Sequence, residues 1–208
     1  NGSPKGKSKK CNSLICAREF VRDMEEPCEI RSLIASDYDE LARYLHNFET
    51  VIFILPLYIH AMPGILMKFI EGMEPAADEN RRMGFIVQAG FMETAQHDYL
   101  EAYFENLARQ LGYTYLGTVS KGEAAGFYMY PKMFKKVFRL FNELGVAYEK
   151  THAFDEDIAG KLARPYKLSP LKLGFLNLVT ALGLTNIGWH SVLRKNNAIE
   201  RRMDKPFA

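Results

Sequence analysis

Three short apolar runs, separated by helical patterns, constrain the fold of this chain more than any other feature. Residues 51–55, Val-Ile-Phe-Ile-Leu, are continuously apolar, residues 83–87 read as a second buried strand, and residues 115–119 are a third candidate. Strands of a parallel sheet read in this way when helices cover both of their faces. Residues 65–73 and 100–111, which lie between these runs, have apolar side chains at helical spacing. This alternation predicts an α/β fold, a doubly wound parallel sheet with helices on both faces.

Further elements are expected on either side of these runs. Residues 28–34 alternate apolar and polar side chains, which predicts an edge or half-buried strand. Asp37, with Glu40 three residues later, predicts the start of a short helix. A stripe of Phe, Val and Leu over residues 134–144 predicts a core-packed helix that ends at Gly145.

Length and composition limit the domain organisation and the class of partner. With 208 residues, 48% of them hydrophobic, the chain can bury one substantial core. We expect residues 1–150 to form the sheet domain and residues 151–208 to form a helical extension packed on it. A net charge of +2 and the lack of a basic stripe with interleaved aromatic residues argue against nucleic-acid binding. The longest apolar run, residues 171–184, contains Lys172 and Asn177 and is too short for a membrane span.

The cysteines and histidines form no metal-binding pattern. Cys11, Cys16 and Cys28 are scattered and odd in number, without Cys-x-x-Cys spacing. Such cysteines are typical of free thiols in a reducing cytoplasm rather than of a disulfide framework. We therefore expect a cytoplasmic protein without a metal site.

The first thirteen residues are rich in Gly, Ser and Lys and lead directly into an amphipathic run. A loop of this kind before a helix presents backbone N–H groups and hydroxyls to an anion, which predicts a phosphate-binding loop. The spacing fits neither a P-loop, which needs four residues between its glycines, nor the dinucleotide fingerprint. A flexible basic tail is the alternative interpretation of this composition.

A phosphate-binding loop of this kind should follow a strand, and the loop here begins at Asn1. In the doubly wound strand order 2-1-3-4-5 that strand is central. We therefore expect the first strand to be missing from this sequence. The sheet would then have a gap between residues 28–34 and residues 51–55, with unpaired backbone groups on both sides.

Three motifs together resemble one known family. They are Asn-Gly-Ser-Pro leading to Asn12-Ser13, the run Pro-Leu-Tyr-Ile-His-Ala-Met-Pro-Gly at 56–64, and Gln-Ala-Gly-Phe-Met-Glu at 88–93. With the segment at 121–126 and the tail at 201–206, they make the chain similar to the flavodoxin-like NAD(P)H-dependent FMN reductases over nearly its whole length.

The resemblance implies a binding site for FMN. Ser3, Asn12 and Ser13 would hold the phosphate, with Lys5 as a weaker candidate. The loop of Pro56, Leu57, Tyr58 and Ile59 would lie along the isoalloxazine edge and offer backbone N–H groups, and Ala89, Gly90 and Phe91 would flank the ring. An ordinary packed loop aromatic is the alternative for Tyr58.

No catalytic side chain is expected, because hydride transfer from nicotinamide to flavin N5 requires positioning and the cofactors carry the chemistry. His60 is interpreted as a surface histidine rather than a proton donor. Trp189 and His190 could cover a neighbouring flavin or simply pack, and the sequence leaves both possibilities open.

By this resemblance, the protein would take a hydride from NAD(P)H onto bound FMN. It would then pass electrons to a quinone, a nitro or azo compound, or another flavin. The alternative is a flavodoxin-like electron carrier without a substrate pocket of its own. The apolar tail from about residue 168 to 184 also predicts a homodimer that buries part of it.

Overall fold

The three apolar runs form the three strands of one sheet. The computed structural model describes residues 1–34, 36–76, 78 and 80–204. In it, β1 (Thr50–Pro56), β2 (Arg82–Gln88) and β3 (Thr114–Lys121) pair in parallel in the order β1-β2-β3. The carboxyl-terminal halves of the strands are buried, because helices cover both faces of the sheet. The predicted parallel sheet is therefore confirmed.

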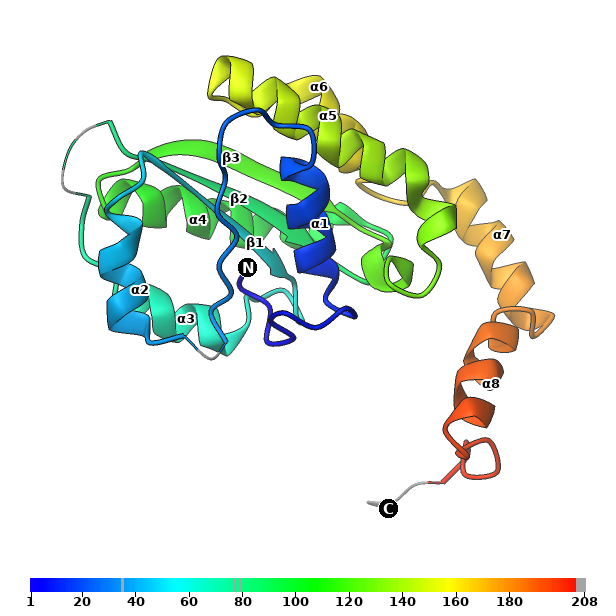
Figure 1. Ribbon diagram of the computed structural model, residues 1–208. Coiled ribbons are helices and arrows are strands. Elements are labelled where there is room, and N and C mark those ends of the chain that lie inside the picture. Colours follow the sequence, from blue (N-terminus) through cyan, green and yellow to red (C-terminus); the bar gives the residue numbers. More distant parts are fainter. Residues whose placement is uncertain (35, 77, 79, 205–208) are drawn as a thin grey trace. The chain divides into compact units, whose positions relative to one another are not determined.

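Helices lie on both faces of this sheet (Figure 1). One face is covered by α2 (Tyr38–Leu45), α3 (Gly64–Glu71) and α4 (Asp98–Gln110), and the other by α1 (Asn12–Val21), α5 (Lys135–Thr151) and α6 (Glu156–Leu162). On the first face the ring of Phe85 lies between those of Phe53 and Phe104, with centroid distances of 5.6 Å and 3.8 Å. Each face therefore has its own aromatic-rich core.

Short 3-10 helices follow β2 and β3 at their carboxyl ends. They are η1 (Thr94–His97) after β2, and η2 (Ala124–Gly126) and η3 (Pro131–Phe134) after β3. Because the strands are parallel, these turns and the loops that lead into α1 and α3 lie at the same edge of the sheet. The carboxyl edge of the sheet is therefore bordered by these turns and loops.

The local helix signals are mostly confirmed. The side chain of Asp37 accepts a hydrogen bond of 3.0 Å from the backbone N–H of Glu40, which caps α2. Gly112 follows the end of α4 with a φ of 72°, as expected for a helix-ending glycine. Gly145 was predicted to end a helix, and this is wrong, because α5 continues to Thr151.

The predicted strand at residues 28–34 is also wrong. The segment is part of no strand, and its backbone bonds to Asn1 at Arg31 and Leu33 rather than to β1. A cavity of about 320 Å³ lies between it and β1, where the expected order 2-1-3-4-5 has its central strand. A strand needs a neighbour to pair with, and this cavity separates the segment from the edge of β1.

The chain divides into two compact units, Asn1–Lys167 and Leu168–Ala208. Residues 151–167, which the sequence grouped with the extension, belong to the first unit because α6 packs against α5 and β3. The second unit holds α7 (Pro170–Ala181) and α8 (Asn186–Lys195). Its packing on the first unit stays a prediction.

No single helix among the described residues is long and apolar enough to cross a membrane. The pair α7 and α8 meets these two criteria only together, across a bend of 49°.

Candidate functional site

Backbone hydrogen bonds tie the loops at the carboxyl edge of the sheet to one another. The N–H of Leu57 donates to the carbonyl of Gln88 (2.8 Å), which joins the loop after β1 to β2. The N–H of Ala124 donates to the carbonyl of Ala89 (2.8 Å), which joins the loops after β3 and β2. Three segments far apart in sequence therefore meet at one edge, as the sequence predicted for the ends of parallel strands.

The N-terminal loop folds as successive tight turns. The N–H of Gly6 donates to the carbonyl of Ser3, and that of Ser8 to the carbonyl of Lys5, at 3.0 Å each. Gly6 has a φ of 51°, and a Cβ there would lie 2.1 Å from the side chain of Ile34, so only glycine fits. The loop is thus ordered by specific contacts.

The start of α1 leaves hydrogen-bonding groups available. Cys11, the N-cap residue, makes no side-chain cap, and the described residues supply no acceptor to the N–H groups of Asn12, Ser13 and Leu14. The amide Nδ2 of Asn12 donates to the carbonyl of Ala124 (2.7 Å), whereas its Oδ1 is buried and has no partner among the described residues. This helix start can accept an anion at its N–H groups and a donor at Asn12.

Two buried polar residues at strand ends lie near the first turns of α1, and the sequence patterns indicated no role for them. Gln88, the last residue of β2, donates from Nε2 to the Oγ of Ser13 (3.3 Å). Lys121, the last residue of β3, is only 4% exposed, and burial lowers the pKa of its ammonium group. Gln88 directly follows the apolar run 83–87, and Lys121 follows the run 115–119 by two residues, which was the available signal in the sequence.

The loop after β1 is a strained turn. Tyr58 and Ala61 exchange two backbone hydrogen bonds (2.8 and 3.1 Å), and the two residues between them, Ile59 and His60, have φ values of 49° and 62°. The ring Nδ1 of His60 lies 3.3 Å from the carbonyl oxygen of Gln96, so the turn also contacts the loop after β2. Non-glycine residues rarely adopt positive φ, and a β-branched isoleucine least of all.

These hydrogen bonds limit which backbone N–H groups of residues 56–59 could bind a flavin. Pro56 has no N–H group, and those of Leu57 and Tyr58 are engaged within the chain. Among the four residues named from the resemblance, Ile59 alone keeps an N–H group without a partner in the described residues, and its side chain is 90% exposed.

The second expected flavin loop contains one buried and two exposed residues. Ala89 is buried, and its N–H donates to the carbonyl of Lys121 (2.9 Å). Gly90 and Phe91 are exposed, and the carbonyl of Phe91 accepts from the N–H of Glu123 (2.7 Å). Phe91 therefore stands at the surface beside the loop after β3.

Ser3 and Lys5 differ in their accessibility. Ser3 is 3% exposed, and its Oγ accepts from the N–H of Lys5 (3.3 Å). The ammonium group of Lys5 lies 5.4 Å from the ring centroid of Tyr128, in the segment after β3. A cation over an aromatic face is stabilised by the ring quadrupole, so Lys5 brings positive charge to this edge.

The other residues considered for a role are the Trp-His pair near the carboxyl terminus and the residue types that bind metals. Trp189 and His190 lie on α8, in the second compact unit. No group of three or more His, Cys, Asp or Glu side chains suited to a metal occurs among the described residues. His97 is buried in η1 without a partner for either ring nitrogen in that part of the chain, and burial lowers its pKa to about 4.

Comparisons with known proteins find similarity in structure only. No family model and no curated protein matches the sequence. An NADH:FMN oxidoreductase in its apo form has a TM-score of 0.55 and 13% identity, covering 79% of this chain and 92% of that one. An NADPH-quinone reductase from P. pentosaceus has a TM-score of 0.53 and 14% identity, covering 68% and 92%.

An azoreductase from Bacillus anthracis strain Sterne follows, with a TM-score of 0.50 and 11% identity, covering 69% of this chain and 93% of its own. Identities of 11–14% are evidence of architecture rather than of activity. This chain has the flavodoxin-like α/β fold of these three reductases.

Proposed function

We propose that this protein is an FMN-dependent oxidoreductase. It takes a hydride from NAD(P)H onto bound FMN and passes electrons to a quinone, a nitro or azo compound, or another flavin. The observation that carries the proposal is the meeting of the N-terminal loop, the start of α1 and the loops after β1 and β2 at one edge of the sheet. Ligands of doubly wound sheets bind at this edge. The names of the structural neighbours, two of which are FMN and quinone reductases, support the same class.

The residues at this edge fit the chemical groups of FMN. The N–H groups of Asn12, Ser13 and Leu14 suit a phosphate, because they lie at the positive end of α1. The buried Oδ1 of Asn12 needs a donor, and the hydroxyls of a ribityl chain are donors. An exposed N–H at Ile59 and the exposed ring of Phe91 suit the polar edge and the face of an isoalloxazine.

FMN, when bound, supplies hydride acceptance and electron donation, so the protein contributes binding and orientation. Gln88 fixes the hydroxyl of Ser13, and Asn12 ties the start of α1 to the loop after β3. The buried ammonium of Lys121 places positive charge close to the same edge, which favours an anionic ligand. Homodimerisation through the second unit belongs to the same proposal.

The visible spectrum of the purified protein and its turnover test this proposal. We expect flavin absorbance, release of FMN on denaturation, and steady-state oxidation of NADPH or NADH with a quinone acceptor. Stoichiometric FMN binding without turnover would favour the electron carrier. Failure to bind FMN at micromolar concentration would contradict both the oxidoreductase and the electron carrier.

Ser13→Ala tests the phosphate site separately. We expect this variant to weaken FMN by about one to two decades, since a hydrogen bond to a charged group contributes roughly 1.5–3 kcal/mol. Riboflavin, which has no phosphate, should be weakened far less in a fluorescence titration. Ser191→Ala, at an exposed serine of α8, is the control and should leave both affinities unchanged. Equal weakening of the two ligands would rule out the assignment.

A further inference from the structure

The segments that contain the loops of the carboxyl edge carry positive charge only. Residues 1–18, 51–70 and 124–142 contain ten Lys and Arg side chains and no Asp or Glu. The whole chain has a net charge of only +2, so the residues outside these segments are net acidic. The charge of the protein is therefore distributed unevenly, with the excess of cations in the segments that meet at this edge.

Exposed lysines of two segments lie next to each other at this edge, and we call them the lysine rim. They come from the loop before α1 and from η3 and the first turn of α5, and they are Lys5, Lys7, Lys9, Lys10, Lys132, Lys135 and Lys136. The ammonium group of Lys5 lies 5.4 Å from the ring centroid of Tyr128, and Asn12 bonds to Ala124. The N-terminal loop and the segment after β3 are therefore neighbours (Figure 1, blue and light green).

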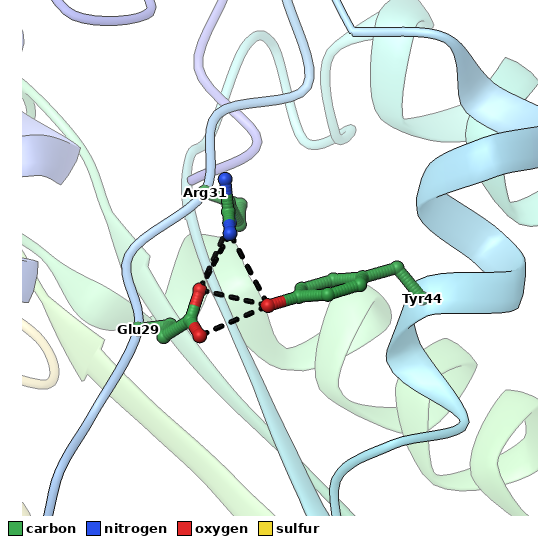
Figure 2. A network of polar contacts seen from close by, with 3 residues as sticks. All are labelled: Glu29, Arg31 and Tyr44. Atoms are coloured by element: carbon green, nitrogen blue, oxygen red, sulfur yellow. Dashed lines mark hydrogen bonds and ion pairs between the residues drawn. The ribbon is translucent and has the colours of Figure 1, made fainter.

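The lysine rim differs from cationic side chains elsewhere in the first unit that are paired with carboxylates. Figure 2 shows Arg31 bonded to the carboxylate of Glu29 (2.7 Å) and to the hydroxyl of Tyr44 (3.2 Å). Arg81 likewise pairs with Asp78 (3.0 Å). Within the part of the chain that the structure describes, no lysine of the rim makes an ion pair. Their charges are therefore available to an anionic partner.

Exposed apolar side chains lie among these lysines. Met129, Tyr130 and Met133, in the segment after β3, are 42–78% exposed, and we call them the apolar patch. Two phenylalanines hold the same segment from the inside, because Phe127 is fully buried and the ring of Phe134 packs on it at a centroid distance of 4.9 Å. The core thus fixes the segment through its phenylalanines, while the apolar patch is left in contact with water.

A second copy of the chain does not fit this surface, whereas an anionic bilayer does. In a two-fold dimer the same surface lies on both copies, so the lysine rim would face its own equivalent, and opposed like charges weaken an interface. The phosphates of an anionic bilayer attract ammonium groups, and the apolar stems of lysines can lie along its surface. Methionine and tyrosine side chains can enter the boundary between the headgroups and the acyl chains.

We propose that the lysine rim and the apolar patch dock this protein on an anionic membrane surface. The lysines supply the electrostatic attraction, and Met129, Tyr130 and Met133 supply the apolar area that leaves water on binding. The whole surface lies in the first compact unit, so docking does not require α7 or α8. It does not require bound FMN either, because every residue of the surface is in place in the protein alone.

Co-sedimentation of the full chain with vesicles at low salt tests the charge. The vesicles are phosphatidylcholine with about one third phosphatidylglycerol, and phosphatidylcholine alone. We expect binding to the anionic vesicles that is at least about ten-fold stronger and is lost at high salt. Lys135→Gln with Lys136→Gln should weaken it by about 25-fold, since each lysine near such a surface contributes about five-fold. Lys150→Gln with Lys161→Gln, at exposed lysines of the last turn of α5 and of α6, is the matched control and should have little effect.

A second pair of variants tests the apolar patch. Met133→Ser should weaken binding to the anionic vesicles by about ten-fold, because less apolar area leaves water. Met203→Ser, at a methionine of the second unit that is 80% exposed, should leave binding unchanged. Equal binding to the two kinds of vesicle, or an equal loss in either control, would overturn the proposal. Binding to polyglutamate without binding to vesicles would overturn it as well and would assign the lysine rim to an acidic protein.

Discussion

At the scale of single residues, two residues lower the stability of the folded state, one through backbone strain and one through a buried polar side chain. Ile59 adopts a positive φ with a side chain that is 90% exposed, so packing does not compensate its backbone strain. His97 is 1% exposed and has no hydrogen-bond partner among the described residues. Both residues lie at the carboxyl edge, where strained and buried polar groups are expected at a ligand site.

Ile59→Gly should stabilise the fold. A non-glycine residue at positive φ destabilises the fold by about 1–3 kcal/mol, and glycine removes this strain. The greater freedom of glycine in the unfolded chain reduces the gain by about 0.5–1 kcal/mol. Urea denaturation should therefore show a gain of about 0.5–2 kcal/mol. Met133→Gly, at a residue that is 78% exposed and without positive φ, is the matched control and should lose stability. A loss in Ile59→Gly would show that the turn carries no strain.

His97 should make stability depend on pH between about 6.5 and 4. Burial lowers its pKa from 6.5 to about 4, so in this range the unfolded chain binds a proton that the native protein does not. The contribution is complete above pH 6.5 and is lost as pH falls toward 4, at up to about 1.4 kcal/mol per unit. The free energy of unfolding in urea at pH 7, 6 and 5 measures it. His97→Phe should reduce this dependence of stability on pH. His60→Gln, at an exposed histidine, is the control and should leave the dependence unchanged. The same dependence in the unmodified protein and in both variants would contradict the prediction.

At the scale of elements, the contact of α1 with α5 depends on one glycine. A Cβ at Gly145 would lie 1.8 Å from the backbone carbonyl oxygen of Phe20, so the two helices approach too closely for any side chain. Gly160 of α6 has no atom within 4 Å of the same position. These two helical glycines therefore have opposite consequences for stability.

Gly145→Ala should destabilise the protein by about 1–3 kcal/mol, the usual cost of overpacking, despite the better helix propensity of alanine. Gly160→Ala should gain about 0.5–1 kcal/mol, because only propensity changes. Both values follow from thermal or urea denaturation. Equal signs for the two variants would mean that α1 and α5 separate easily.

At the scale of the whole molecule, the second unit exposes an apolar stripe. Leu171, Phe175, Leu178 and Leu182 are spaced by four, three and four residues along α7 and its C-cap, and each is 58–85% exposed. This spacing places them on one face of a helix, and an exposed apolar face of this kind marks an interaction surface. It supports the proposed homodimer, in which a second copy covers the stripe.

Phe175→Glu should therefore convert a dimer to a monomer. A charge placed in an apolar interface costs several kcal/mol, enough to shift the dissociation constant by more than about two decades. Light scattering at micromolar concentration measures the change. Thr180→Glu, exposed on the opposite face of α7, is the control and should leave the dimer intact. A monomeric unmodified protein would contradict the prediction.

The sequence by itself determined the features that depend on neighbouring residues. The three strands, the cap at Asp37 and the end of α4 near Gly112 follow from side-chain periodicity and local backbone preference. The position of the site loops at strand ends follows from the same patterns, because parallel strands end at one edge.

Only the tertiary structure decided the features that depend on distant partners. Gly145 lies inside α5, where a side chain would collide with the backbone of Phe20, and residues 28–34 form no strand because they do not pair with β1. Gln88 bonds to Ser13 of α1, and Lys121 lies near Cys16 of the same helix, because the fold brings the ends of β2 and β3 to α1. Pairing, burial and close approach are properties of two segments together, so the pattern of either segment alone does not contain them.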